Sequence, residues 1–223
     1  VAIEDEDRKI DLNRLMLANG NAPDDRRLEV FQRLLDTLEI DRAVADAVVD
    51  WLDNDDTPRA GGAESSHYLG LPHPYQAKND LFDTIGELRL VRGVTSEVFA
   101  KLLPFVTVSS SGKVNINTAP KEVLMSLSAG TDLAEVGAID AKTADEIIEY
   151  RKDHPFTKAD EIGNVSPFLR DLYTRTPVKD LVDVRSTFFH VRSEGEVAGT
   201  IRAVDAIGAR VGNEIQWRFW RLE

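Results

Sequence analysis

"VRSTFFHVRSEGEVAGTIRAVDAIGARVGNEIQWRFWRLE", residues 184–223, is the stretch that decides the fold. Apolar and polar side chains alternate along it, which is typical of β-strands with one buried face. One predicted same-face set is Val197, Gly199, Ile201 and Ala203, and a second is Ile215, Trp217 and Phe219. Turn signals at "SEGE" and "VGN" predict about three strands in an antiparallel meander. So small a sheet is marginal alone, and a helix preceding the chain is a candidate to cover its apolar face.

The chain before residue 178 follows a helical period instead. Two sets of apolar residues each have the spacing of one helix face. The first comprises Leu28, Phe31, Leu34, Leu35 and Leu38, and the second comprises Val44, Val48, Val49 and Leu52, with Asp41 placed to cap the second helix. We therefore predict an α+β protein with a helical domain at 24–177. Residues 1–22 and 178–223 are expected to form a separate scaffold, in which the first segment supplies a strand or the end of the preceding helix.

The helical part repeats itself. The stretch "AVADAVVDWLD" (43–53) matches "KTADEIIEYRK" (142–152) in an Ala-Asp pair, two apolar residues, an acid and an aromatic residue. Further on, "LFDTIGELRLV" from Leu81 matches "PFTKADEIGNV" from Pro155, with Phe and the acid five positions apart in both. The two halves are therefore predicted to be related units.

The first unit contains an insertion. Trp51 and Phe82 are thirty-one positions apart, whereas the matching Tyr150 and Phe156 are six apart. The inserted residues 53–80 are rich in carboxylates and have few candidates for a hydrophobic core. Something must therefore offset the entropy lost when this backbone becomes ordered.

The composition is that of a folded, acidic protein. The 223 residues are 42% hydrophobic, and 27 Lys and Arg against 39 Asp and Glu give a formal charge of −12, so a field that attracts phosphate backbones or anionic lipid is missing. The chain has no Cys, which excludes disulfides and thiolate sites but leaves the compartment open. It opens "VAIEDEDRKIDLN" without Met and has no run of about 18 apolar residues, so we expect the soluble part of a longer protein.

A nucleic-acid-binding module is the main alternative. "VNINTAPKEVLMSLS" (114–128) followed by "TADEIIEYRKDHPFTKADEI" (143–162) looks like the helix-hairpin-helix modules of DNA-binding competence proteins, whose hairpin offers backbone amides to phosphate. The intervening "AGTDLAEVGAID" (129–140) has three acids and no basic residue, which favours a helical packing motif without DNA contacts. A hydrolase with an acidic active site is a third possibility, although the sequence shows no substrate cleft.

Other chemical motifs are weak. In "SSSGKVN" (109–115) no glycine stands five positions before the Gly-Lys pair, so a hairpin turn is favoured over a nucleotide-binding P-loop. Ser110 and Lys113 match S-x-x-K, but the accompanying Lys-Thr-Gly is missing. Only His67 and His73 lie close together in the sequence, which disfavours a zinc site.

The insertion begins with spacing that resembles a calcium loop. Counting from Asp53 as position 1, Asp55, Thr57 and Glu64 take positions 3, 5 and 12 of an EF-hand loop. Position 6 is Pro58 instead of glycine, so the loop is not an EF-hand. Calcium nevertheless accepts six to eight oxygens in flexible geometry. A bound calcium ion and a solvated acidic loop both fit, and the calcium ion is favoured because unneutralised acids oppose the dipole at a helix C-terminus.

Two long stretches of the sequence resemble a known family. "VVDWLDNDDTPRAGGAESSHYLGLPHPYQAKNDLFDTIGELRLVRGVT" (48–95) and "VNINTAPKEVL" (114–124) are similar to the K-type minor pseudopilins of bacterial type II secretion, also called general secretion pathway protein K. "KIDLN" (9–13) departs slightly from the "KINLN" expected there. The resemblance implies a pseudopilin scaffold, in which an N-terminal helix packs on an antiparallel sheet, with a large inserted all-α domain.

The resemblance also implies a function and a site. It implies a non-enzymatic protein that caps the pseudopilus tip with the I-type and J-type minor pseudopilins, helps to start pseudopilus assembly for the export of folded proteins, and binds no nucleic acid. Its soluble part would lie in the periplasm, below a removed prepilin signal and an inner-membrane helix. The family is known for structural Ca²⁺ in the inserted domain, and the implied ligands here are Asp53, Asp55, Asp56, Glu64 and Asn79. Asp132, in the acidic segment of the second half, is expected to play no part.

Overall fold

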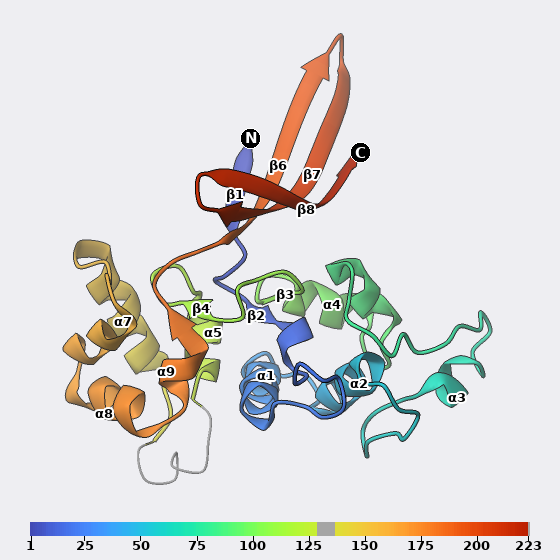
Figure 1. Ribbon diagram of the computed structural model, residues 1–223, viewed down its shortest axis with the longest axis horizontal. Coiled ribbons are helices and arrows are strands. Elements are labelled where there is room, and N and C mark those ends of the chain that lie inside the picture. The colour runs from blue at the N-terminus through green and yellow to red at the C-terminus, as the bar shows by residue number, and fades with distance from the viewer. Residues whose placement is uncertain (129–136, 223) are drawn as a thin grey trace.

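The computed structural model describes residues 1–128 and 137–222 and contains an antiparallel sheet beside a larger helical part (Figure 1). The sheet stands at one end of the molecule, and the helices spread out beneath it. This arrangement confirms the predicted α+β fold class. None of the helices in the described residues is long and apolar enough to cross a bilayer.

The sheet has four strands, one more than the tail alone predicts. They are β1 (Ala2–Asp5), β6 (Phe188–Val197), β7 (Thr200–Val211) and β8 (Glu214–Leu222). Their order is β1-β6-β7-β8, and all neighbours are antiparallel. The first residues of the chain therefore supply an edge strand to the meander.

The turn between β6 and β7 lies later than predicted. The stretch "SEGE" continues β6, and the hairpin closes at Ala198 and Gly199, with φ values of 51° and 79°. Two consecutive residues with positive φ form the tight turn whose twist matches that of paired strands. The predicted face of Val197, Gly199, Ile201 and Ala203 is therefore wrong because the chain reverses inside it, whereas the turn predicted at "VGN" is confirmed by Gly212.

A β-bulge in β8 changes which side chains share a face. Gly208 pairs with Trp217 and Ile207 with Phe219, so Arg218 is the extra residue. The predicted placement of Phe219 beside Trp217 is wrong for this reason, and Trp220 takes that face. Four large apolar side chains then line one face of β8 with exposed fractions of about one half or more: Ile215 49%, Trp217 56%, Trp220 68% and Leu222 62%.

The helical part holds the remaining elements. Its helices are α1 (Asp25–Thr37), α2 (Ala43–Leu52), α3 (Ser65–Tyr68), α4 (Ser96–Leu102), α5 (Lys121–Ser126), α7 (Ala141–Asp153), α8 (Pro167–Arg175) and α9 (Val178–Leu181). The 3-10 helices are η1 (Leu12–Arg14), η2 (Ile85–Leu90) and η3 (Ala159–Asn164). The apolar faces predicted for α1 and α2 are buried, except that Leu38 is only partly so. The side chain of Asp41 accepts a hydrogen bond from the N–H of Ala43, the first residue of α2.

The helical core extends beyond the predicted range 24–177. Residues Ile10 and Leu12 are buried in it, and β2 (Ile10–Asp11) pairs in parallel with β3 (Val106–Thr107). At the other end, β5 (Val182–Asp183) pairs in parallel with β4 (Val114–Asn115). These two short strand pairs bring both flanking segments into the helical core.

The two predicted units share a half-buried hydrogen-bond clamp. In the first unit Asn13 donates through Nδ2 to the carbonyl of Phe82 (2.9 Å) and accepts at Oδ1 from the N–H of the same residue (2.8 Å). In the second unit Asn117 makes the same two bonds with Phe156, each 2.9 Å. One asparagine side chain thus satisfies both backbone groups of the phenylalanine that comes after α2 in the first unit and after α7 in the second.

Aromatic stacking and a helix cap repeat as well. The rings of Trp51 and Phe82 stack at 6.4 Å, and those of Tyr150 and Phe156 stack at 5.5 Å. Each phenylalanine precedes a 3-10 helix whose third residue, Glu87 or Glu161, accepts a hydrogen bond from the N–H of the N-cap residue, Thr84 or Lys158. The units lie side by side, with α1 of the first packed against α5 of the second (Figure 1).

Two carboxylates at the start of the chain join the sheet to the helical part. Asp7 is fully buried and accepts backbone hydrogen bonds from Ser111 (2.6 Å), Thr187 (2.5 Å) and Phe188 (2.9 Å). Asp5 accepts from the side chains of Thr118, Ser186 and Asn115. Because these bonds reach both parts, they fix how the sheet sits on the helical part.

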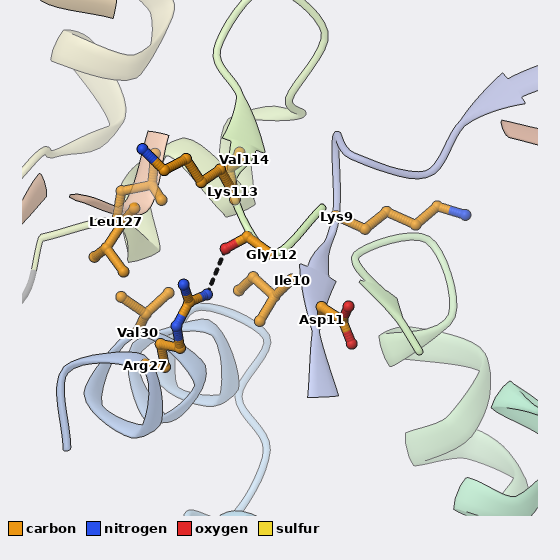
Figure 2. Close-up of a pocket in the computed structure, with 10 residues that line it drawn as sticks. Lys9, Ile10, Asp11, Arg27, Val30, Gly112, Lys113, Val114 and Leu127 are labelled. Atoms are coloured by element: carbon orange, nitrogen blue, oxygen red, sulfur yellow. Dashed lines mark hydrogen bonds between the residues drawn. The ribbon is translucent and has the colours of Figure 1, made fainter. Parts of the chain in front are cut away.

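Asp11 is a buried acid on β2, at the edge of a small pocket. Figure 2 shows this pocket between α1 and β2, with Arg27 donating across it to the carbonyl of Gly112 at 2.5 Å. Its volume of about 20 Å³ gives room for about one water molecule. On β2, Asp11 accepts from Ser110 Oγ (2.9 Å) and from the N–H of Asn13 (2.9 Å). Burial raises the pKa of Asp11 from 3.8 to about 6.

The raised pKa of Asp11 predicts a pH dependence of stability. The folded state keeps the Asp11 proton to a higher pH than the unfolded state does, so stability falls as pH rises from about 4 through 6, by at most about 3 kcal/mol. Denaturant unfolding at pH 4.5 and 7 with saturating calcium measures this loss. Asp11→Asn cannot ionise and should show a smaller loss than the wild type. Equal losses in the two proteins would contradict the assignment.

Candidate metal centre

The candidate site starts at the C-terminal end of α2. This helix is apolar on most sides, and Asp50 in its last turn is fully buried. Asp53 follows as the C-cap residue with an extended backbone and is 8% exposed. Residues three positions apart lie on the same side of a helix. Two carboxylates therefore meet at the point where the insertion begins.

The insertion folds back closely over α2 because of two glycines. A Cβ atom on Gly62 would lie 1.9 Å from Oδ2 of Asp50, and one on Gly61 would lie 2.9 Å from Cα of Ala43. Arg59, just before these glycines, also ties the insertion to α2: it donates through Nε to Asp46 (2.9 Å) and through its backbone N–H to Asp50 (3.0 Å). The "GGAE" stretch thus brings Glu64 onto the end of α2.

Glu64 completes a group of three buried carboxylates, here called the acidic triad: Asp50, Asp53 and Glu64. One oxygen from each lies within 4.8 Å of the others. Glu64 is only 2% exposed, and neither of its oxygens accepts a hydrogen bond from a described residue. Oδ1 of Asp53 is buried and equally without a donor in the described chain. Acceptors buried in this way are costly unless a cation or donor pairs with them.

A further buried oxygen, without a donor in the part of the chain that the structure describes, lies at the far end of the insertion, on Asn79. Asn79 has a positive φ of 49° and donates through Nδ2 to the carbonyl of Asp55 at 3.0 Å. Its Oδ1 is buried and has no donor among the described residues. Asp55 and Asp56 are exposed, and Asp55 accepts from the N–H of Thr57 at 2.7 Å. These two acids lie at the rim of the site.

Aromatic side chains pack beside the triad. The ring of Trp51 meets that of Tyr68 edge to face at 5.4 Å, and Tyr75 stacks on Tyr68 at 5.2 Å. Tyr68 is fully buried and accepts a hydrogen bond from the N–H of Arg92, whose side chain donates to the carbonyl of Gly62 at 2.7 Å. The insertion therefore contributes more to the core than its sequence predicts, because its tyrosines are held by the aromatic end of α2.

The electrostatics of the triad are unfavourable without a cation. Burial, followed by the nearby charges of Asp50 and Asp53, raises the pKa of Glu64 to about 7. Burial, followed by the charges of Asp55 and Asp50, raises the pKa of Asp53 to about 6. The pKa of Asp50 is raised as well, mainly by burial. Each shift measures how strongly the site resists holding three negative charges.

The donor set fits calcium. All candidate ligands are carboxylate or amide oxygens, which hard cations prefer, and the exposed His67 and His73 offer no soft ligand to the triad. Calcium accepts the irregular geometry of a loop more readily than magnesium does. The exposed fractions of 0, 8 and 2% for Asp50, Asp53 and Glu64 also disfavour a catalytic role, because a substrate could not reach them.

A second group of possible ligands, Glu4, Glu6 and His190, lies on the sheet side of the described structure. Lys9 already neutralises Glu6 at 2.8 Å and approaches Glu4 at 3.6 Å. His190 contacts Asp205 through Nε2 at 3.0 Å. These side chains have partners, so the group is not a candidate metal centre.

The structure brings together part of the predicted ligand set and adds one residue. Asp53 and Glu64 meet, and the free oxygen of Asn79 is buried, whereas Asp55 and Asp56 stay at the surface. The sequence did not predict Asp50 as a ligand, because it lies within the apolar helical run "AVADAVVDWL" and not in the acidic loop that follows. Its spacing of three from Asp53 was the available signal.

Comparison with known proteins identifies relatives for most of the chain. The family profile "Type II secretion system (T2SS), protein K" matches residues 8–111. The chain is 32% identical over 190 residues to the type II secretion system protein K of Aeromonas hydrophila, covering 82% of this chain and 56% of the relative. It is 34% identical over 167 residues to the protein K of Pseudomonas aeruginosa, covering 72% and 46%. The chain thus spans about half the length of these relatives.

One solved structure is similar over the whole chain. It is a chain of the GspK–GspI–GspJ complex from the type 2 secretion system of enterotoxigenic Escherichia coli, with a TM-score of 0.77 and 20% identity, covering 100% of this chain and 78% of that one. At this identity the likeness establishes the fold. The family profile and these relatives show that the chain belongs to the type II secretion system protein K family.

Proposed function

We propose that the protein is a minor pseudopilin that caps the tip of the type II secretion pseudopilus. The observation that carries this proposal is the similarity of the whole chain, at a TM-score of 0.77, to a chain of a complex named for three such components. By this likeness its partners are the I-type and J-type minor pseudopilins. The family assignment gives no support to a nucleic-acid-binding module.

The shape of the molecule supports a position at the tip. The helical part is broad and occupies one end of the sheet (Figure 1). A subunit stacked above that end would meet the helices instead of a sheet edge. The bonds of Asp5 and Asp7 hold the helical part in this position.

The uncovered sheet face supports a pseudopilin scaffold. Trp217 and Trp220 are more than half exposed on this face, and Ile3 of β1 is 68% exposed. An apolar face of this kind must pack against another layer in a stable protein. We infer that an N-terminal helix covers it in the assembled protein, with its hydrophobic start in the inner membrane and the described part in the periplasm. In this role the protein is a structural component and not an enzyme.

We also propose that the acidic triad, with the Oδ1 atom of Asn79, holds a structural calcium ion. When bound, the ion supplies the positive charge that the three buried carboxylates lack. Asp50 and Asp53 come from the end of α2, whereas Glu64 and Asn79 come from the insertion. An ion between them therefore ties both ends of the insertion to the helix. The support for this proposal is the set of buried oxygens without donors.

Calcium should stabilise the protein. A ligand that binds only the folded state adds about 2.7 kcal/mol at a hundredfold excess over its dissociation constant, which corresponds to roughly 5 to 10 °C in melting temperature for a chain of this size. A chelator should lower the melting temperature by this amount and expose residues 53–80 to proteases. Calorimetric titration of the chelated protein measures the binding. If it detects no calcium uptake at millimolar ion, the calcium proposal fails.

Single substitutions locate the ion. Asp53→Ala or Glu64→Ala should abolish the effect of calcium on the melting temperature, and in chelator each should melt no lower than the wild type, because repulsion is relieved. Glu97→Ala is the matched control, since Glu97 is an exposed acid on α4. Asp132 lies outside the described residues and is a less defined control. A full calcium response in Glu64→Ala would place the ion elsewhere.

The soluble domains of the I-type and J-type partners should co-elute with this chain in size-exclusion chromatography at micromolar concentration. Ile201→Ser, which changes an exposed apolar residue on the sheet face opposite Trp220, should weaken this association, because partners are expected to bind the scaffold side. Leu103→Ser, a change to an exposed apolar residue of the helical part, should leave it intact. Separate elution of all three wild-type proteins would remove the main support for the tip complex.

A further inference from the structure

The repeated features align the two units residue by residue. The aromatic residues that stack on the clamped phenylalanines are Trp51 in the first unit and Tyr150 in the second. Both precede the end of a long helix, α2 in one case and α7 in the other. Because this alignment rests on contacts as well as on sequence, it can be extended to the neighbouring positions.

Two charged positions near the end of each helix can be compared in this way. At one of them both units have an acid, and at the other the first unit has an acid and the second has a lysine. Asp50 stands one residue before Trp51, and Glu149 stands one residue before Tyr150. Asp53 stands two residues after Trp51, where the second unit has Lys152. The first unit therefore has two like charges one helical turn apart, and the second unit has opposite charges in the same two positions.

In the second unit these two side chains form an ion pair. Lys152 Nζ donates to Glu149 Oε2 at 2.5 Å. Both side chains are largely exposed, so water also solvates their charges. In the first unit the insertion covers the equivalent place, excludes water, and adds the buried Glu64, which has no counterpart because the second unit lacks an insertion.

We propose that this one position decides how each unit neutralises the end of its second helix: Lys152 supplies the cation from the chain itself, whereas Asp53 makes the first unit depend on a divalent ion. The proposal rests on the calcium site proposed above and adds its regulation. Removal of the ion should loosen the insertion and the end of α2, and leave α7 unchanged. Calcium would then stabilise the first unit and have no effect on the second.

The charges support this division. The ionised acidic triad has three negative charges, and replacing Asp53 by lysine changes the local sum from −3 to −1. An ammonium group has three N–H donors and no acceptor, so it can donate to Asp50 and to the two free oxygens of Glu64. A buried carboxylate is tolerated when such a partner is present and costly when it is not. One lysine can therefore take over part of the role of the ion.

The test compares Asp53→Lys with Asp53→Met, which has a side chain of similar length without the charge. Melting temperature and protease cleavage within residues 53–80 are measured in calcium and in chelator. In chelator, Asp53→Lys should melt above both Asp53→Met and the wild type, and its insertion should survive protease at least tenfold longer than the wild-type insertion does. Neither variant should respond to calcium as the wild type does.

Hydrogen exchange of the wild-type protein gives a second, independent measurement. Chelation should increase exchange in residues 50–82 and leave 141–153 unchanged. Equal increases in both segments would overturn the proposal. So would an Asp53→Lys variant that does not fold, or one that melts no higher than Asp53→Met in chelator. If the wild type binds no calcium, the proposed calcium site itself is wrong. If the wild type binds calcium but Asp53→Lys melts no higher than Asp53→Met in chelator, the calcium site is retained and only the role proposed for this position is wrong.

Discussion

The burial of three carboxylates at the end of α2 is the constraint on which the first unit depends. Asp50, Asp53 and Glu64 are nearly inaccessible to water, and burial raises the pKa of each. A protein tolerates such a group only when a cation or protons neutralise it. The glycines that admit the chain, the arginine that ties it to α2 and the tyrosines that pack beside it all hold the insertion over this one place.

The remainder of the molecule repeats one plan twice and then attaches a sheet. Each unit closes with an asparagine clamp on a phenylalanine, an aromatic stack and a short parallel strand pair. The buried Asp7 joins this helical part to the sheet. The helical part thus has the carboxylate-rich insertion at one side, and the sheet has an exposed apolar face.

Much of this plan was predictable from the sequence. The change of period gave the sheet and the helical part, and the repeat gave the two units. The errors came from single residues. The hairpin closes at Ala198, which is not a typical residue for a positive φ, and the bulge at Arg218 leaves no mark in the pattern. Asp50 belongs to an apolar helix, so only the folded structure shows that the insertion brings Glu64 close to its carboxylate.

Terbium luminescence can detect a metal ion at the acidic triad, because terbium replaces calcium at oxygen sites and emits when a nearby tryptophan is excited. Trp51 lies between two triad residues, whereas Trp217 and Trp220 lie on the sheet. We expect emission that calcium suppresses, that Trp51→Phe abolishes and that Trp217→Phe leaves unchanged. Emission that survives Trp51→Phe, or no emission from the wild type, would contradict a metal ion at the acidic triad.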